Sequence, residues 1–205
     1  MQTQLEYVCE VYMRSEKLVR KTKETDIFVE LNLDGIGKAD IDTGIGFFDH
    51  MLSIIAVHGG VDLTVKCKGD LNVDGHHTVE DIGIVLGKLI DKALGDKKGI
   101  ARFACEYVPM DDSLARSVID LSGRSFLVYN AGHLSGYIGA YDADLTEEFF
   151  RAVCSYGMIN LHIDLLRGSN THHMCEAIFK SFARAFGSAI RITSDKVLST
   201  KGALE

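Results

Sequence analysis

The segment His76-His77-Thr78-Val79-Glu80-Asp81 has a counterpart in His172-His173-Met174-Cys175-Glu176-Ala177. In each segment two adjacent histidines precede a glutamate by four and three residues, and an apolar pattern with helical spacing follows. Four of the 8 histidines in the chain lie in these two pairs. The recurrence predicts two helices that each begin with three metal-ligating side chains, in a chain built from two similar halves.

The two helices that follow the motifs are expected to be amphipathic. Their apolar residues recur every three to four positions, which gives each helix one buried face. These residues are Ile82, Val85, Leu86, Leu89, Ile90, Ala93 and Leu94 in the first helix, and Ala177, Ile178, Phe182, Ala185, Phe186, Ala189 and Ile190 in the second.

Similar elements precede each motif. In the first half, alternating apolar residues over 27–33 predict a strand that enters a hairpin at Asp34-Gly35, before a helix over 47–57 and a strand over 61–67. In the second half, strands over 118–121 and 126–129 flank a turn, before a helix over 145–156 and a strand over 160–166. The order strand, strand, helix, strand, helix thus occurs twice.

This order predicts an α/β (α+β) fold with an internally duplicated strand-helix unit. The sheets should be antiparallel or mixed and covered by helices on one side. We expect one domain over 1–205, made of pseudo-repeats over about 1–95 and 96–205. Residues 91–114, which contain the only proline, Pro109, are expected to connect the halves.

Composition limits the classes of function. The chain has 46% hydrophobic residues, and its 22 basic and 29 acidic residues give a net charge of −7, which disfavours nucleic-acid binding. No run of about 18 apolar residues occurs, which argues against a membrane span. Glu6, Glu10 and Glu16 near the start argue against a secretory signal, so we expect a cytoplasmic protein.

The five cysteines are expected to be reduced core residues. They are widely spaced, odd in number and contain no Cys-x-x-Cys pair. Cys175 lies inside the second motif, but on a helix it points away from the face that His173 and Glu176 share, so we expect a core residue and not a ligand.

The motifs favour a transition-metal site. On a helix His76 and Glu80 share a face, as do His172 and Glu176, and imidazole with carboxylate suits Mn, Fe, Zn, Co or Ni. Adjacent histidines diverge by roughly 100°, which implies two metal ions. We expect the second histidine and the glutamate of a motif to serve one metal, and the first histidine to reach the other, in the same or another subunit.

His50 is a further candidate, on the apolar helix over 47–57. Such a histidine is commonly a core residue. Alignment of the helix ends at Gly59 and Gly157, however, places Glu148 opposite His50, so both halves carry a candidate ligand at this position. Alignment of the two Phe-Phe pairs instead shifts this match.

Several segments, taken in order, resemble the imidazoleglycerol-phosphate dehydratase family. The resemblance runs from about Arg20 to Gly202 and implies a duplicated α/β fold, two Mn²⁺ ions per active site, a large octahedral homo-oligomer and a dehydration in histidine biosynthesis. The absence of a phosphatase-like extension resembles the single-activity form. The segments are Arg20-Lys21-Thr22-Lys23-Glu24-Thr25, Phe47-Phe48-Asp49-His50-Met51-Leu52, the two motifs with Phe179-Lys180, Asp120-Leu121-Ser122-Gly123-Arg124 and Ser199-Thr200-Lys201-Gly202.

The resemblance also implies roles for individual residues. It implies metal ligation by His50, His76, His77, Glu80, His172, His173 and Glu176. It implies substrate contacts at Glu24, Arg102, Arg124, Lys180, Ser199 and Lys201. Two positions depart from the family pattern: Gly46 stands where proline is common, and Glu148 stands where many relatives have a histidine ligand, so its ligation stays open.

The implied substrate explains this combination of groups. The proton to be removed lies on a carbon with no adjacent carbonyl, so two metals that bind the imidazole as imidazolate would let the ring store electrons while the hydroxyl leaves. Glu24 and the ligands Glu80 and Glu176 are candidates for proton transfer, and Glu24 is favoured because it need not be a ligand. The arginines and lysines would bind the phosphate.

Two other functions use the same ligands. One is a dinuclear metal hydrolase that acts on a phosphorylated or amide substrate, and the other is a metal-storage protein. Neither has a use for the Ser-Thr-Lys-Gly tail, and the ligand order differs from that of His-Glu-x-x-His hydrolases.

Overall fold

The computed structural model describes residues 14–132 and 134–201. The first half contains β1 (Ser15–Lys21), β2 (Thr25–Asn32), β3 (Ala39–Asp42), α1 (Gly46–Gly59), β4 (Asp62–Gly69) and α2 (His76–Leu94). The second contains β5 (Phe103–Met110), β6 (Ser113–Asp120), β7 (Phe126–Asn130), β8 (Tyr137–Ile138), β9 (Tyr141–Asp142), α3 (Leu145–Gly157), β10 (Asn160–Arg167) and α4 (Thr171–Ala189).

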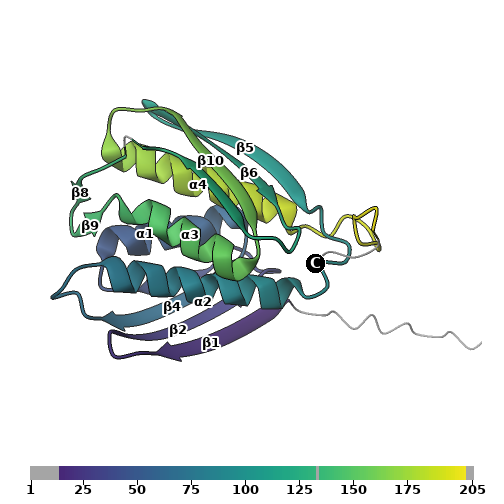
Figure 1. The fold of residues 1–205 in the computed structure, drawn as a ribbon, viewed down its shortest axis with the longest axis horizontal. Coiled ribbons are helices and arrows are strands. Elements are labelled where there is room, and N and C mark those ends of the chain that lie inside the picture. The colour runs from purple at the N-terminus through teal and green to yellow at the C-terminus, as the bar shows by residue number, and fades with distance from the viewer. Residues whose placement is uncertain (1–13, 133, 202–205) are drawn as a thin grey trace, which may run out of the picture.

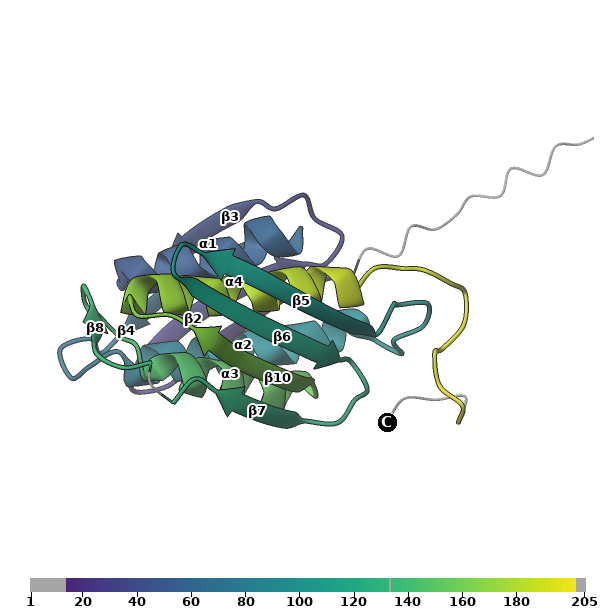
Figure 2. The same ribbon diagram turned by 90° about the horizontal axis from the view of Figure 1, so that it is seen from above.

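The two halves form four-stranded mixed sheets of the same topology. The first sheet has the order β1-β2-β4-β3, with β3 parallel to β4 and the other pairs antiparallel. The second has the order β5-β6-β10-β7, with β7 parallel to β10 (Figure 2). The short strands β8 and β9 have no counterpart in the part of the first half that the structure describes. The predicted duplication is confirmed.

The helices lie between the two sheets (Figure 1). α1 and α2 cover the first sheet, α3 and α4 cover the second, and the two layers meet where α1 packs on α4 and α2 packs on α3. Each sheet therefore has helices on one face, as the sequence predicts. The core between the layers is rich in aromatic side chains, among them Phe149, Phe150, Phe179, Phe182 and Phe186.

Small residues let the paired helices approach closely. A Cβ atom on Gly83 would lie 2.8 Å from Cβ of Ala152, and one on Gly187 would lie 2.3 Å from the carbonyl oxygen of Gly59. Phe47 and His172, at the starts of α1 and α4, are also in contact. The members of each pair therefore run in parallel. The starts of α2 and α4, which carry the histidine motifs, lie at one end of the molecule (Figure 1).

The sequence predicted the helices well but missed five strands. β1, β3, β5 and the short β8 and β9 were not predicted, and β2 does not enter a hairpin after Asp34-Gly35: its partners are β1 and β4. The predicted connector over 91–114 is also wrong, because it contains β5. β1, β3 and β5 are edge strands with mixed polar and apolar residues, and an edge position accommodates Pro109.

The cysteines only partly match the prediction of core residues. Cys154 and Cys175 are buried, and burial raises the pKa of the Cys175 thiol to about 12. Cys67 is half-buried, but Cys105 is exposed because its position on β5 faces away from the helices. Cys9 lies outside the described residues.

Of the helices in the described part of the chain, none has both the length and the apolar character that a membrane span requires.

Candidate metal centre

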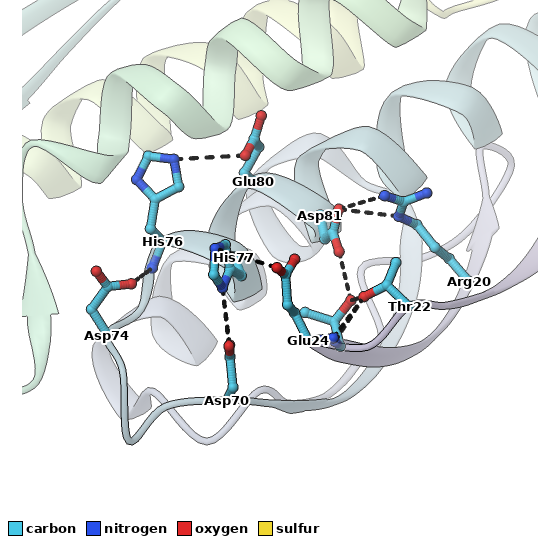
Figure 3. A network of polar contacts seen from close by, with 10 residues as sticks. Arg20, Thr22, Glu24, Asp70, Asp74, His76, His77, Glu80 and Asp81 are labelled. Carbon is cyan, nitrogen blue, oxygen red and sulfur yellow. Dashed lines mark hydrogen bonds and ion pairs between the residues drawn. The ribbon is translucent and has the colours of Figure 1, made fainter.

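The first motif occupies the first two turns of α2 (Figure 3). The carboxylate of Asp74 accepts a hydrogen bond of 2.8 Å from the backbone N–H of His76, one of the donors that a helix start leaves without an intrahelical partner. The ring of His76 extends along the helix, and its Nε2 lies 3.6 Å from Oε2 of Glu80. Both side chains are half-exposed, so these two donors face solvent at the start of the helix.

His77 points in a different direction from His76. Its Nδ1 lies 3.1 Å from the carboxylate of Asp70, the residue after β4, and its Nε2 lies 4.0 Å from Oε1 of Glu24 in the turn between β1 and β2 (Figure 3). The hydrogen bond with Asp70 raises the pKa of His77 above its ordinary value. In the neutral ring this bond holds the proton on Nδ1 and leaves the lone pair on Nε2, which is the form that binds a metal.

The second motif begins α4 in the same way. The side chain of Asn170, the N-cap residue, accepts a hydrogen bond from the backbone N–H of His173. Nε2 of His172 lies 3.2 Å from Oε2 of Glu176, the counterpart of the contact between His76 and Glu80. His50 on α1 joins this group, with its Nε2 3.8 Å from the same carboxylate oxygen. The structure therefore brings His50, His172 and Glu176 together.

His173 repeats the arrangement of His77 with different partners. Its Nδ1 lies 2.7 Å from the carboxylate of Asp112, and its Nε2 lies 3.5 Å from Asp111. Both aspartates belong to the turn between β5 and β6. The hydrogen bond with His173, together with bonds from the backbone of Ser169 and Asn170, holds the pKa of Asp112 well below its usual range.

In both motifs, then, the first histidine faces the glutamate and the second faces an aspartate. This differs from the expected grouping of the second histidine with the glutamate, because four residues along a helix lie on one face more closely than three do. The second histidines instead meet carboxylates that the strand ends supply. Ligands from one motif therefore point in two directions.

Glu176 and Glu80 differ in their surroundings. The side chain of Glu176 is only 9% exposed, and Nζ of Lys180 lies 2.7 Å from its Oε1. Burial raises the pKa of Glu176, but Lys180 and the neighbouring histidines lower it by more, so the carboxyl is held ionised. Glu80 is half-exposed, and the position that matches Lys180 on α2 is Ile84.

Glu148 lies at the position in α3 that matches His50 in α1. Both helices end in a left-handed C-cap residue, Gly60 and Met158, and with these caps aligned the buried positions of the two helices coincide. Within the described residues the ion-pair partner of Glu148 is Arg151, with Nε and Oε2 3.8 Å apart.

The phosphate-binding candidates are divided between the two ends of the molecule. Lys180 lies near the second motif, but the backbone N–H of Arg102 donates to the carbonyl of Ala189 at the far end of α4. From His172 to Ala189 the helix rises about 25 Å. The Arg102 side chain pairs with Asp120 and donates to the carbonyl oxygen of Leu198.

The other phosphate candidates lie beyond the same far end. Arg124 is exposed in the turn after β6, while Ser199 is half-buried and Lys201 exposed in the segment after Leu198. Gly202 lies outside the described residues. Within one chain, therefore, these residues are separated from the histidine motifs by the length of a helix.

The donor set suits a transition metal. Each motif offers imidazole nitrogen and carboxylate oxygen, and each second histidine has a carboxylate partner on its other nitrogen, a common feature of metal-binding histidines. His50, His172 and Glu176 lie near one another, but over residues 14–132 and 134–201 neither they nor any other three His, Cys, Asp or Glu side chains are arranged so that they could hold a metal ion within one chain.

Comparison with known proteins identifies the family. The model of the imidazoleglycerol-phosphate dehydratase family matches residues 43–186. The chain belongs to this family. An imidazoleglycerol-phosphate dehydratase from Exiguobacterium sp. is 54% identical over 194 residues, covering 94% of this chain and 100% of the relative. One from Thermodesulfovibrio yellowstonii is 52% identical over 192 residues, with the same coverage.

Solved structures of the dehydratase family share the fold. The imidazoleglycerol-phosphate dehydratase of Staphylococcus aureus matches with a TM-score of 0.79 and 43% identity over 87% of this chain and 99% of its own. The Pyrococcus furiosus protein matches with a TM-score of 0.79 and 34% identity over 91% and 100%.

The aspartates around the motifs were not predicted from the sequence. Asp70, Asp111 and Asp112 contact the second histidines, and Asp81 anchors the turn that carries Glu24. Asp70 follows a predicted strand and could have been found from its place at the end of that strand. Asp111 and Asp112 could not, because β5, which delivers them, was not predicted.

Proposed function

We propose that this chain catalyses the conversion of imidazoleglycerol phosphate to imidazole acetol phosphate in histidine biosynthesis, with two Mn²⁺ ions per active site. The observation that carries the proposal is the repeated start of α2 and α4, where a histidine faces a glutamate and the next histidine faces an aspartate, in a member of the dehydratase family. The enzyme is then a metal-dependent hydro-lyase.

The metal ligands would come from both motifs. The proposed set is His50, His76, His77, Glu80, His172, His173 and Glu176, with Glu148 as a further candidate. Bound metal ions would supply Lewis-acid stabilisation of the negative charge on the imidazole ring, which would be bound as imidazolate. Other divalent transition metals suit the same donors.

Glu24 is the proposed acid–base group. Dehydration requires a proton to leave a substrate carbon and another to reach the departing hydroxyl. Within the described residues Glu24 makes no ion pair with lysine or arginine, and its carboxylate lies 4.0 Å from Nε2 of His77, so it borders the metal centre and keeps its oxygens available. Glu176 suits metal ligation better than proton transfer, because Lys180 holds it ionised.

The substrate phosphate would be bound by cationic side chains of more than one subunit. Lys180 lies beside Glu176, but the far end of α4, where Arg102 is bound, lies about 25 Å from His172 along the helix in the same chain, and Arg124, Ser199 and Lys201 lie beyond that end. One imidazoleglycerol phosphate molecule cannot span that separation. We therefore propose that the far end of one chain meets the motif end of another, in the large octahedral homo-oligomer that the family resemblance implies.

A direct assay tests the proposal. The protein, loaded with Mn²⁺, is incubated with imidazoleglycerol phosphate, and the ketone product is followed by NMR together with inorganic phosphate. Formation of imidazole acetol phosphate without phosphate release is expected, and the Glu24→Gln variant should form it far more slowly. Release of phosphate without the ketone would favour a hydrolase, and metal binding with no turnover would favour storage.

A further inference from the structure

A buried polar network connects α2 with the turn that carries Glu24. Asp81 directly follows Glu80, and only 7% of it is exposed. Its Oδ1 accepts hydrogen bonds from Nε and Nη2 of Arg20 on β1, at 3.1 and 2.9 Å (Figure 3). Its Oδ2 accepts a hydrogen bond of 2.5 Å from the hydroxyl of Thr25 on β2. Both oxygens of this buried carboxylate are therefore used to bind the first hairpin.

The network continues through the turn itself. The hydroxyls of Thr25 and Thr22 lie 3.1 Å apart, and the hydroxyl oxygen of Thr22 accepts hydrogen bonds from the backbone N–H groups of Glu24 and Thr25, at 3.1 and 2.9 Å. The N–H of Thr22 donates to the carbonyl of Thr25, which closes the turn. The backbone N–H of Glu24 is thus three hydrogen bonds away from Asp81.

The other side of Glu24 is hydrogen-bonded to Asp70, which contacts the first motif. Its carbonyl oxygen accepts a hydrogen bond of 3.0 Å from the N–H of Asp70, the residue whose carboxylate contacts Nδ1 of His77. Glu24 is therefore held through its N–H by the Asp81 network and through its carbonyl by Asp70. Its carboxylate position relative to His77 depends on both.

The second half of the molecule shows that the fold does not need this network. Gly69 and Gly168 occupy corresponding places: a Cβ atom on Gly69 would meet Thr78 and Thr25, and one on Gly168 would meet Met174 and Ser113. Thr78 and Met174 are the third residues of the two motifs, so Ser113 is the counterpart of Thr25.

The counterpart of Asp81 in α4 is Ala177, since the motifs align His76 with His172. Within the described residues the buried hydroxyl of Ser113 has no hydrogen-bond partner. The same packing is therefore achieved without the carboxylate, and among the described residues the network occurs only in the half that contains Glu24.

We propose that Asp81, acting through Thr25 and Thr22, is a positioning residue that holds the Glu24 turn against the metal-binding helix α2. The inference rests on the proposed role of Glu24 as the acid–base group. It predicts that loss of the contact between Asp81 and Thr25 impairs the chemical step and leaves substrate binding and metal binding intact.

Thr25→Val is the most selective test, because valine has the shape of threonine but cannot donate to Asp81. We expect kcat to fall by about tenfold to a hundredfold with little change in KM and in bound metal. Thr25→Ser should restore most of the activity, because it keeps the hydroxyl. Ser113→Ala, which removes the counterpart hydroxyl in the second half, should leave kcat unchanged.

A double-mutant cycle separates positioning from a general structural effect. In the Glu24→Gln background, Thr25→Val should lower kcat by less than about twofold, because the group that it positions is already lost. An equal loss in both backgrounds, or a wild-type kcat for Thr25→Val, would overturn the proposal. Asp81→Asn, tested in the same way, guards against an effect peculiar to valine.

Hydrogen exchange gives a measurement that needs neither metal nor substrate. In the metal-free protein, peptides that cover residues 20–28 should exchange faster in Thr25→Val and Asp81→Asn than in the wild type, and Ser113→Ala should exchange like the wild type. If the wild-type protein does not convert imidazoleglycerol phosphate, the proposed function fails, and this measurement decides the inference: unchanged exchange over 20–28 would overturn it.

Discussion

The Nδ1 atom of His173 lies 2.7 Å from Oδ1 of Asp112, although 61 positions of sequence separate the two residues. The first half has the same relationship between His77 and Asp70, at 3.1 Å. The aspartates come from different places, the turn between β5 and β6 in one half and the end of β4 in the other. Two different loops thus provide the same chemical environment, which indicates that a carboxylate behind the second histidine matters to the site.

Removal of either carboxylate should weaken metal binding. Asp112→Asn or Asp70→Asn leaves an amide that no longer favours the histidine form with a free Nε2 lone pair, and loss of such a partner typically costs about tenfold to a hundredfold in metal affinity. Isothermal titration of the metal-free variants with Mn²⁺ measures this loss. Asp40→Asn, which disrupts an exposed pair with Lys66, serves as the control and should bind like the wild type. Unchanged affinity in both test variants would contradict the role of these aspartates.

The raised pKa of His77 predicts how metal binding and stability depend on pH. Because Asp70 raises the pKa of His77 in the folded protein, the contribution of this pair to the stability of the metal-free protein is complete below the ordinary histidine value of 6.5 and is lost as pH rises through the higher folded-state value. A raised pKa means that more of the His77 rings are protonated near pH 7, and a metal that binds the ring must displace that proton. Mn²⁺ binding near pH 7 should therefore release more protons in the wild type than in Asp70→Asn. Titrations in buffers of different ionisation enthalpy measure that difference, and equal release would be evidence against it.

The sequence predicted which side chains gather at the starts of α2 and α4, because a helix start brings residues three and four positions apart together locally. His76, His77 and Glu80 are close in space simply because they share two turns of a helix, and the same holds for the second motif. The relationship of His50 to Glu176 follows from the packing of α1 on α4, which the sequence does not state. His50 was named as a candidate from its match with Glu148 and from the family resemblance, and its ligation stays a prediction.

The sequence could not predict the turns that adjoin edge strands, nor the distance between Arg102 and the histidine motifs. β1 and β5 alternate weakly because one edge and one face of each are solvated, and so the turns that deliver Glu24 and Asp112 had no predicted strand before them. To predict the distance between Arg102 and the motifs, one must likewise know in which direction α4 runs and what lies at its end. Both are properties of the tertiary arrangement and not of any local pattern.

Removal of metal should weaken assembly, since the proposed sites are shared between subunits. We expect chelation to lower the particle mass measured by light scattering, and added Mn²⁺ to restore it. Circular dichroism should show that the helices persist in the smaller species, because the core between the two sheets is independent of the motifs. A particle of unchanged mass after complete metal removal would argue against sites at subunit contacts.

Two variants that are inactive alone should restore activity together. His173→Ala damages the motif end of the chain, and Arg124→Ala damages the far end. If each active site combines the motif end of one chain with the far end of another, a mixture that is dissociated and reassembled should regain about a quarter of the wild-type activity, because one site in four receives two intact ends when equal amounts mix at random. A mixture of Arg124→Ala with Lys201→Ala is the matched control, since both changes lie at the same end. Failure of the first mixture to recover would place both ends in one chain's site.

The segment after Leu198 should serve the substrate and not the fold. Arg102, itself held by Asp120, donates to the carbonyl oxygen of Leu198, so the chain is anchored just before Ser199 and Lys201 while the Lys201 side chain stays exposed. Lys201→Ala should therefore remove a charge-assisted contact with the substrate phosphate worth roughly 1.5 to 3 kcal/mol, or about one to two decades in kcat/KM. Its melting temperature should equal that of the wild type, because an exposed lysine contributes little to stability.

Lys196→Ala, which changes an exposed lysine before the anchor, should keep wild-type kinetics. If Lys201→Ala also keeps them, the segment has no role in substrate binding, and if it instead lowers the melting temperature, the segment stabilises the fold.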